Sequence, residues 1–303
     1  MNILQKFRTW RNREITPYKV IMVDGGFCST LVKYALGRSI ETKLGIEVKY
    51  DLSWFDQNGM DCDNIHERKF QLLEVFPELK FDVASQSEIQ KAKKKGHYHN
   101  RLPYQYCEDV YSAQTQYIDG YYEHWKYMQA NRKELIDELD FTSLDLDSKN
   151  TEVLKCIKNT NSIAVHARRG DFVNLGLCIL DADYYRRAIQ EVVQRVGGDD
   201  VHIFFFSNDM DWVRENVLVG VGCEHTLVDF NNNNLGYLDL FLISCCNHQI
   251  SSNSSFGFWG GFLNQNENKI VAIPEKWLPK EEGECEGALE AHLMPEWITV
   301  NIK

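Results

Sequence analysis

Two consecutive arginines, Arg168 and Arg169, follow a short apolar run in the segment SIAVHARRGDF, residues 162–172. An arginine presents a planar fork of donors that matches phosphate oxygens in pairs, and it does not lose its charge. Residues that directly follow the strands of a parallel sheet line its ligand sites. The two arginines therefore predict an anion site, such as one for a diphosphate. The alternative is that each forms an ordinary surface ion pair.

The same segment holds two more groups that could do chemistry. Asp171 is placed to hold an arginine in its working rotamer, and base catalysis is its less favoured role. His166 stands at the strand end, where a hydrogen-bonded core imidazole is commoner than a catalyst. Both remain candidate catalytic residues beside the two arginines.

Polar side chains also follow two later apolar runs. Ser207, Asn208 and Asp209 come directly after VHIFFF, where they could bind a ribose or a base edge or form a simple turn. Residues 251–255, four serines and an asparagine, precede an apolar helix, and hydroxyl and N–H groups at a helix start bind anions. Ordinary capping needs only one serine. The ligand candidates of this second segment are Asn253, Ser254, Ser255 and Phe256.

Alternating strand and helix patterns must position these groups. Residues 19–23 read as a strand and Gly25 and Gly26 as a turn. Ser29 or Thr30 is predicted to cap the following helix, with Gly45 at its end. A βαβ unit with a glycine turn after its first strand is a frequent site for nucleotide-type ligands.

A second series of α/β units begins near Cys156. Its continuous apolar runs are typical of strands buried on both faces of a parallel sheet. We therefore predict an α/β fold with two Rossmann-like lobes and a cleft between them. The predicted parts are a leader over residues 1–18, a first lobe over 19–155 and a second lobe over 156–303, whose last residues could pack back on the first.

The overall composition limits the partners and the location. The chain has 303 residues and a formal net charge of −11, which argues against nucleic acid as the main partner. It lacks a long apolar span and a signal-peptide pattern, which predicts a cytoplasmic protein. Nine cysteines without CxxC spacing indicate reduced thiols, and no metal ligands are predicted.

The leader combines basic residues with an apolar helical face. Lys6, Arg8, Arg11 and Arg13 interleave with apolar side chains at positions 3, 4, 7 and 10. Such a helix could lie on the anionic inner face of a membrane, with residues 1–15 as the contact. Packing on the domain is the slightly favoured alternative, because one short helix without a lipid anchor binds membranes weakly.

The motifs, taken together, resemble those of glycosyltransferase family 11, the bacterial α-1,2-fucosyltransferases. They run in family order from about Lys19 to Trp297. The matching pieces are GG, YALGRSIE, KYDLSWF, YIDGYYEHWKYM, VHARRGDF, DADYYRRAI, FFFSNDMDWVREN, LDLFLISCCNHQISSNSSFGFWGGFLN and KIVAIPEKW.

This resemblance implies a GT-B-like architecture, with GDP in the C-terminal lobe and the acceptor on the N-terminal lobe. It also implies GDP-L-fucose as the donor, no obligatory metal or other cofactor, and inverting transfer to the 2-hydroxyl of a galactoside. Arg168 and Arg169 would then bind the diphosphate, Asp171 would orient them, and residues 253–256 would contact phosphate.

One motif departs from the family. The glycine turn is usually GGLGNQ, whereas here Gly25 and Gly26 are followed by Phe27, Cys28, Ser29 and Thr30. Ser29 replaces the asparagine that would reach the donor phosphate, and a positive φ at Cys28 would be strained. Gly25, Gly26 and Ser29 remain donor-binding candidates. Asp24, just before the turn, is a candidate general base, as are Asp51 and Asp171.

We therefore predict an inverting α-1,2-fucosyltransferase of glycan or surface polysaccharide synthesis. The expected acceptor is a galactose-containing oligosaccharide or a lipid-linked glycan. The altered turn keeps a different nucleotide-sugar donor open as an alternative. A non-catalytic protein that binds sugar nucleotides as a scaffold is the other alternative.

Overall fold

The N-terminal lobe is a five-stranded parallel sheet with strand order β3-β2-β1-β5-β4. A computed structural model describes residues 18–57, 59–60, 67–197, 200–231 and 235–303, so the predicted leader lies outside the described residues except for Tyr18. The strands are β1 (Tyr18–Met22), β2 (Glu47–Asp51), β3 (Asp82–Val83), β4 (His97–Asn100) and β5 (Tyr117–Gly120). The helices are α2 (Phe27–Leu44), α3 (Ser53–Gln57), α4 (Leu72–Val75), α5 (Gln86–Lys95) and the short η1 (Glu108–Tyr111).

The C-terminal lobe is a six-stranded parallel sheet with strand order β11-β10-β9-β6-β7-β8. Its strands are β6 (Asn161–Ala167), β7 (Val201–Ser207), β8 (Glu224–Val228), β9 (His248–Ile250), β10 (Val271–Pro274) and β11 (Ile298–Val300). Its helices are α9 (Gly170–Asn174), α10 (Ala182–Val196), α11 (Met210–Trp212), η3 (Val213–Val217), α12 (Gly236–Cys245), α13 (Ser255–Leu263), η5 (Gly283–Cys285) and α14 (Ala288–His292).

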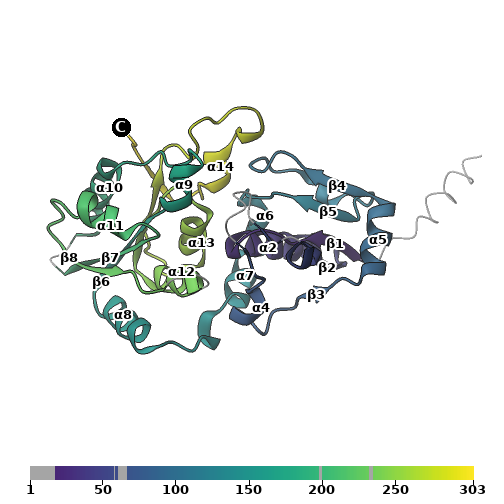
Figure 1. The fold of residues 1–303 in the computed structure, drawn as a ribbon, viewed down its shortest axis with the longest axis horizontal. Coiled ribbons are helices and arrows are strands. Elements are labelled where there is room, and N and C mark those ends of the chain that lie inside the picture. The colour runs from purple at the N-terminus through teal and green to yellow at the C-terminus, as the bar shows by residue number, and fades with distance from the viewer. Residues whose placement is uncertain (1–17, 58, 61–66, 198–199, 232–234) are drawn as a thin grey trace, which may run out of the picture.

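A helical connection joins the two lobes along one side of the molecule (Figure 1). It consists of α6 (Lys126–Gln129), α7 (Arg132–Glu138), η2 (Phe141–Ser143) and α8 (Ser148–Asn159). The predicted boundary between residues 155 and 156 falls inside α8, which packs on α12 of the second lobe. The exact domain limits stay a prediction.

Local sequence signals account for several helix ends. Asp181 accepts a hydrogen bond from the Tyr184 N–H and caps α10, and the helix ends before Gly197. Gly45 ends α2 with a φ of 65°, a left-handed conformation that glycine adopts without strain. The predicted cap of α2 at Ser29 or Thr30 is wrong, because the helix begins at Phe27 with Gly26 as the N-cap.

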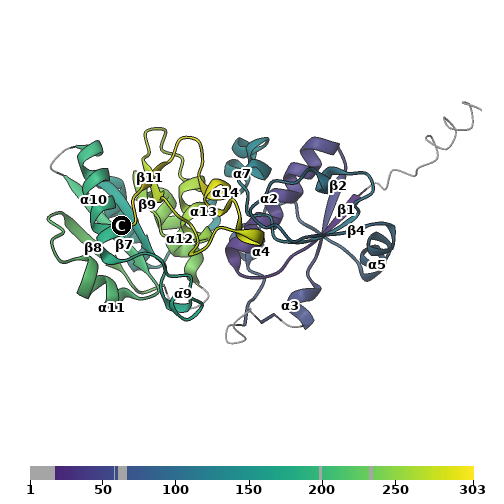
Figure 2. The same ribbon diagram turned by 90° about the horizontal axis from the view of Figure 1, so that it is seen from above.

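One of the hydrophobic clusters spans both lobes. Helix α13 packs on α2, and the buried side chains of Leu31, Phe258 and Trp259 belong to the same cluster. The segment around α14 also reaches the first lobe, where the Trp125 N–H donates to the Ala291 carbonyl at 3.0 Å (Figure 2). Each lobe is an α/β unit built on a parallel sheet, and the two lobes face each other in the predicted GT-B-like fold.

None of the described helices is long and apolar enough to cross a membrane.

Candidate active site

The arginine turn, residues 168–171, follows the carboxyl end of β6. The Arg168 guanidinium donates through Nη2 to Asp171 Oδ2 at 2.8 Å, so this carboxylate fixes the direction of the arginine. Gly170 lets the neighbouring strand end come close, since a Cβ there would lie 2.3 Å from Asn208 Nδ2. Arg168 keeps 27% of its side chain exposed, enough to meet a ligand.

Residues 207–209, after β7, support the arginine turn from the side. Ser207 donates its hydroxyl to the Ala167 carbonyl at 2.8 Å. The Asn208 side-chain oxygen accepts from the Arg169 N–H at 2.9 Å, and Asp209 Oδ2 accepts from Arg169 Nε at 3.2 Å. All three predicted residues therefore bond to the polypeptide around the turn.

The two arginines lie in different surroundings. The Arg169 guanidinium stacks 3.9 Å from the ring centroid of Trp212, and it lines a pocket of about 450 Å³ with Trp212 and Cys178. The Arg168 guanidinium instead pairs with Asp171 and lies 5.6 Å from the ring centroid of Phe172. The two guanidiniums therefore have different partners.

The serine segment, residues 251–256, follows β9 at the same edge of the sheet. Ser252 hydrogen-bonds His166 Nδ1 at 3.1 Å. Burial, followed by the charge of Arg168, lowers the pKa of His166 to about 3, so the imidazole stays neutral. This environment is that of a hydrogen-bonded core imidazole, which the sequence favours over a catalyst.

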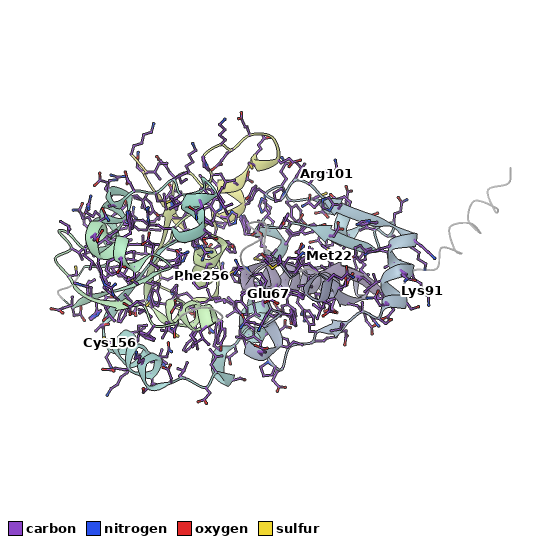
Figure 3. The ribbon with its side chains drawn as sticks, viewed as in Figure 1. Met22, Glu67, Lys91, Arg101, Cys156 and Phe256 are labelled. Atoms are coloured by element: carbon purple, nitrogen blue, oxygen red, sulfur yellow. The ribbon has the colours of Figure 1, made fainter. Side chains whose placement is uncertain are left out.

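The rest of the serine segment forms the start of α13. Ser254 caps this helix by accepting from the Phe256 N–H, and Ser255 is partly exposed. Asn253 donates to the carbonyls of Leu177 and Trp277 at 3.0 and 2.9 Å. Phe256 lies on the side of its lobe that faces the other lobe (Figure 3).

The glycine turn, residues 24–30, comes from the first lobe. Gly25 has a φ of 76°, and a Cβ there would lie 2.9 Å from the Ser29 hydroxyl oxygen. The predicted strain at Cys28 does not arise, because this residue lies inside α2.

Charged side chains from both lobes influence the pKa of the Cys28 thiol. Burial and, to a smaller extent, the Glu123 carboxylate raise the pKa of its thiol to about 12. The guanidiniums of Arg168 and Arg68 act in the opposite direction. Arg168 is therefore near enough to the start of α2 for its charge to act on Cys28.

Two of the candidate bases are held by strong local partners. Asp24 Oδ1 lies 3.4 Å from the ammonium of Lys33, which is almost fully buried. Asp51 is fully buried and accepts from the Tyr117 hydroxyl at 2.7 Å and from the Ser53 N–H at 3.0 Å. Asp51 therefore stabilises the first sheet and is not available to a ligand.

The sequence profile of Glycosyl transferase family 11 matches residues 73–301, which include the arginine turn and the serine segment. The chain belongs to this family.

This family 11 chain aligns with different shares of its relatives' lengths. It is 35% identical to the O-antigen biosynthesis glycosyltransferase WbnK of Escherichia coli over 127 residues, which cover 40% of this chain and 40% of WbnK. It is 25% identical to the alpha-1,2-colitosyltransferase of Escherichia coli over 285 residues, 87% of this chain and 93% of that one. It is 29% identical to human galactoside alpha-(1,2)-fucosyltransferase 1 over 146 residues, 46% of this chain and 38% of the human one.

Three residues of this glycosyltransferase were missed by sequence reasoning. A Cβ on Gly26 would lie 3.8 Å from Arg68 Nε, so this guanidinium lies beside the glycine turn. Glu123 and His292 approach each other from opposite lobes at 3.7 Å. The position of Glu123 in YIDGYYEHWKYM, shortly after a strand, could have indicated a site residue. The many aromatic residues of this segment instead predicted a hydrophobic core.

In the described part of the chain, no group of three or more His, Cys, Asp or Glu side chains is arranged to bind a metal ion.

Proposed function

We propose that this glycosyltransferase moves L-fucose from GDP-L-fucose to the 2-hydroxyl of a galactoside, with inversion. One observation carries the proposal: Asp171 holds Arg168 just after the end of β6, and the charge of this guanidinium reaches Cys28 in the first turn of α2 on the other lobe. A guanidinium fixed at the junction of two lobes can bind a diphosphate on one lobe beside an acceptor on the other. The human α-1,2-fucosyltransferase relative supports the sugar and the linkage.

The proposed reaction is a direct displacement at the anomeric carbon. The acceptor oxygen forms a bond to this carbon while the bond to the β-phosphate oxygen breaks and its electron pair leaves with GDP. Arg168 stabilises the charge that develops on the diphosphate, because a pre-oriented cation needs no reorganisation during the reaction.

The remaining donor contacts are assigned to four elements. The N-terminus of α13, with Ser254 and Ser255, presents donors and the positive end of a helix dipole to phosphate. Gly25, Gly26 and Ser29 contact the donor from the opposite lobe. Residues 207–209 hold the arginine turn in place, and Arg169 approaches the donor from its pocket beside Trp212.

A second donor has its own support. The E. coli alpha-1,2-colitosyltransferase is similar to this chain over almost its whole length, and colitose is a deoxy analogue of fucose. Residues 25–30 read GGFCST, whereas GGLGNQ is usual in the family, and this difference keeps the alternative donor open. GDP-colitose is therefore the rival donor.

The donor is tested by offering GDP-L-fucose, GDP-colitose and GDP-mannose separately with lactose as the acceptor. We expect a fucosyl product, recognised by mass, with glycosidase digestion to establish the linkage. Turnover with GDP-colitose or GDP-mannose but not with GDP-L-fucose would contradict the proposed donor. GDP binding without transfer from any of the three would favour the scaffold alternative.

The basic leader supports a further part of the proposal, a cytoplasmic enzyme that contacts the inner membrane face through residues 1–15. Deletion of these residues is expected to reduce sedimentation with vesicles of anionic phospholipid, because the leader supplies four cationic side chains. Neutral vesicles serve as the control. Equal sedimentation of the full-length and shortened proteins with anionic vesicles would remove the membrane role.

A further inference from the structure

A carboxylate from the first lobe and an imidazole from the second meet at the lobe junction. Glu123 follows β5, and its backbone N–H donates to the Pro103 carbonyl at 2.9 Å. Its Oε2 lies 3.7 Å from Nε2 of His292, in α14. The Glu123 side chain is 17% exposed, whereas His292 is 2% exposed. The carboxylate can therefore reach a ligand, and the imidazole lies behind it.

Glu123 and Arg168 are both near the buried Cys28, at the start of α2. Their charges act on the Cys28 thiol in opposite directions. Glu123 also influences Tyr104 of the first lobe: burial and then the Glu123 charge raise the pKa of its hydroxyl. A sugar whose diphosphate is bound by Arg168 would have its anomeric carbon between that arginine and the first lobe, the side on which Glu123 lies.

The other carboxylates at this junction are less suited to accept a proton. Asp24 lies 3.4 Å from the Lys33 ammonium, and Asp171 lies 2.8 Å from the Arg168 guanidinium. Each of these carboxylates is therefore already engaged by a permanent cation. Among the described residues, the ion-pair partner of Glu123 is the imidazole of His292, which carries a charge only when protonated.

The imidazole is held rigidly in one orientation. His292 Nδ1 lies 2.9 Å from the Ala288 carbonyl, which can only accept, so Nδ1 carries the proton and Nε2 faces Glu123. The ring stacks on Trp277 with 4.0 Å between centroids and an interplanar angle of 11°. The Trp277 carbonyl in turn accepts from Asn253 of the serine segment. This chain of contacts links the position of Glu123 to the start of α13.

We propose that Glu123 is the catalytic base of the transfer and that His292 is a positioning residue for its carboxylate. The assignment rests on the proposed function. As the acceptor oxygen bonds to the anomeric carbon and the electron pair of the breaking bond leaves with GDP, the hydroxyl proton passes to Glu123, which becomes neutral. The unprotonated Nε2 of His292 then accepts a hydrogen bond from the neutral Glu123 carboxyl group, which favours the proton transfer and positions the group.

Glu123→Gln tests the base, because glutamine keeps the shape but accepts no proton under these conditions. With GDP-L-fucose and lactose, kcat is expected to fall by about 10²–10⁴-fold. Azide is the discriminating acceptor, since this anion has no proton to lose. The variant and the wild type should therefore form fucosyl azide at the same rate and bind GDP with the same Kd.

Glu290→Gln is the matched control. Glu290 lies near the same pair, at 3.9 Å from His124, but its side chain is 71% exposed. This variant should transfer to lactose as the wild type does. His292→Gln is expected to lower transfer to lactose by a smaller factor than Glu123→Gln and to leave transfer to azide unchanged, a division that a merely structural role would not produce.

Three outcomes would overturn the assignment. Unchanged transfer to lactose by Glu123→Gln would show that the carboxylate is not the base. An equal loss of transfer to lactose and azide would show that Glu123 acts on the donor or on folding. A wild-type protein that transfers from no nucleotide sugar would refute the proposed function and this role together, whereas the first two outcomes leave the proposed function intact.

Discussion

Arg168→Ala is expected to weaken GDP binding by about 10- to 100-fold, since hydrogen bonds to charged groups contribute about 1.5–3 kcal/mol. Transfer should suffer more, with kcat reduced by about 10²–10³-fold, because charge on the leaving diphosphate grows in the transition state. Calorimetric titration with GDP measures the first effect, and initial rates at saturating donor measure the second.

The same change should affect folding very little. Arg168 is partly exposed and pairs with Asp171 three residues away, and an exposed pair of this kind contributes about 0–1 kcal/mol. The melting temperature should therefore fall by no more than about 2–4 °C. Arg195→Ala, which removes the i,i+4 pair with Glu191 on α10, is the matched control and should change neither GDP binding nor turnover. Undiminished GDP binding by Arg168→Ala would remove the diphosphate assignment.

The sequence predicted the fold well because its signals are local. Strand β6 and strand β7 are continuous apolar runs, and their side chains are buried on both faces of the sheet. The ends of α10 follow from Asp181 and Gly197, because caps act within one turn. The start of α2 was misplaced because Gly26 caps the helix with extended backbone alone, while the Thr30 hydroxyl bonds inside the helix to the Phe27 carbonyl.

The candidate site was predictable only where its residues are neighbours in the chain. Arg168 and Asp171 are three residues apart, and their contact follows from the turn. The pairing of Arg169 with Trp212 depends on how the end of β7 lies beside β6. The meeting of Glu123 with His292 depends on how the C-terminal segment returns to the first lobe, which no local pattern encodes.

Loss of the buried Lys33 ammonium group should destabilise the first lobe strongly. It is almost fully buried, lies 3.4 Å from Asp24 Oδ1, and donates to the Gly120 carbonyl at the end of β5. Lys33→Met would leave the Asp24 carboxylate with an uncompensated charge, and breaking a buried pair in this way costs about 3–5 kcal/mol. The midpoint of urea unfolding, followed by fluorescence, measures the loss.

A control on the same helix and a double variant separate the causes. Lys43→Met removes an exposed pair with Glu108 and should cost less than about 1 kcal/mol. In Asp24→Asn/Lys33→Met, both charges are absent, so most of the lost stability should return. A double variant as unstable as Lys33→Met would show that the lysine acts through the Gly120 carbonyl and its packing, and not through Asp24. The restored protein also tests catalysis, because a folded double variant that still transfers sugar removes Asp24 as the base, a result that Glu123 as the base requires.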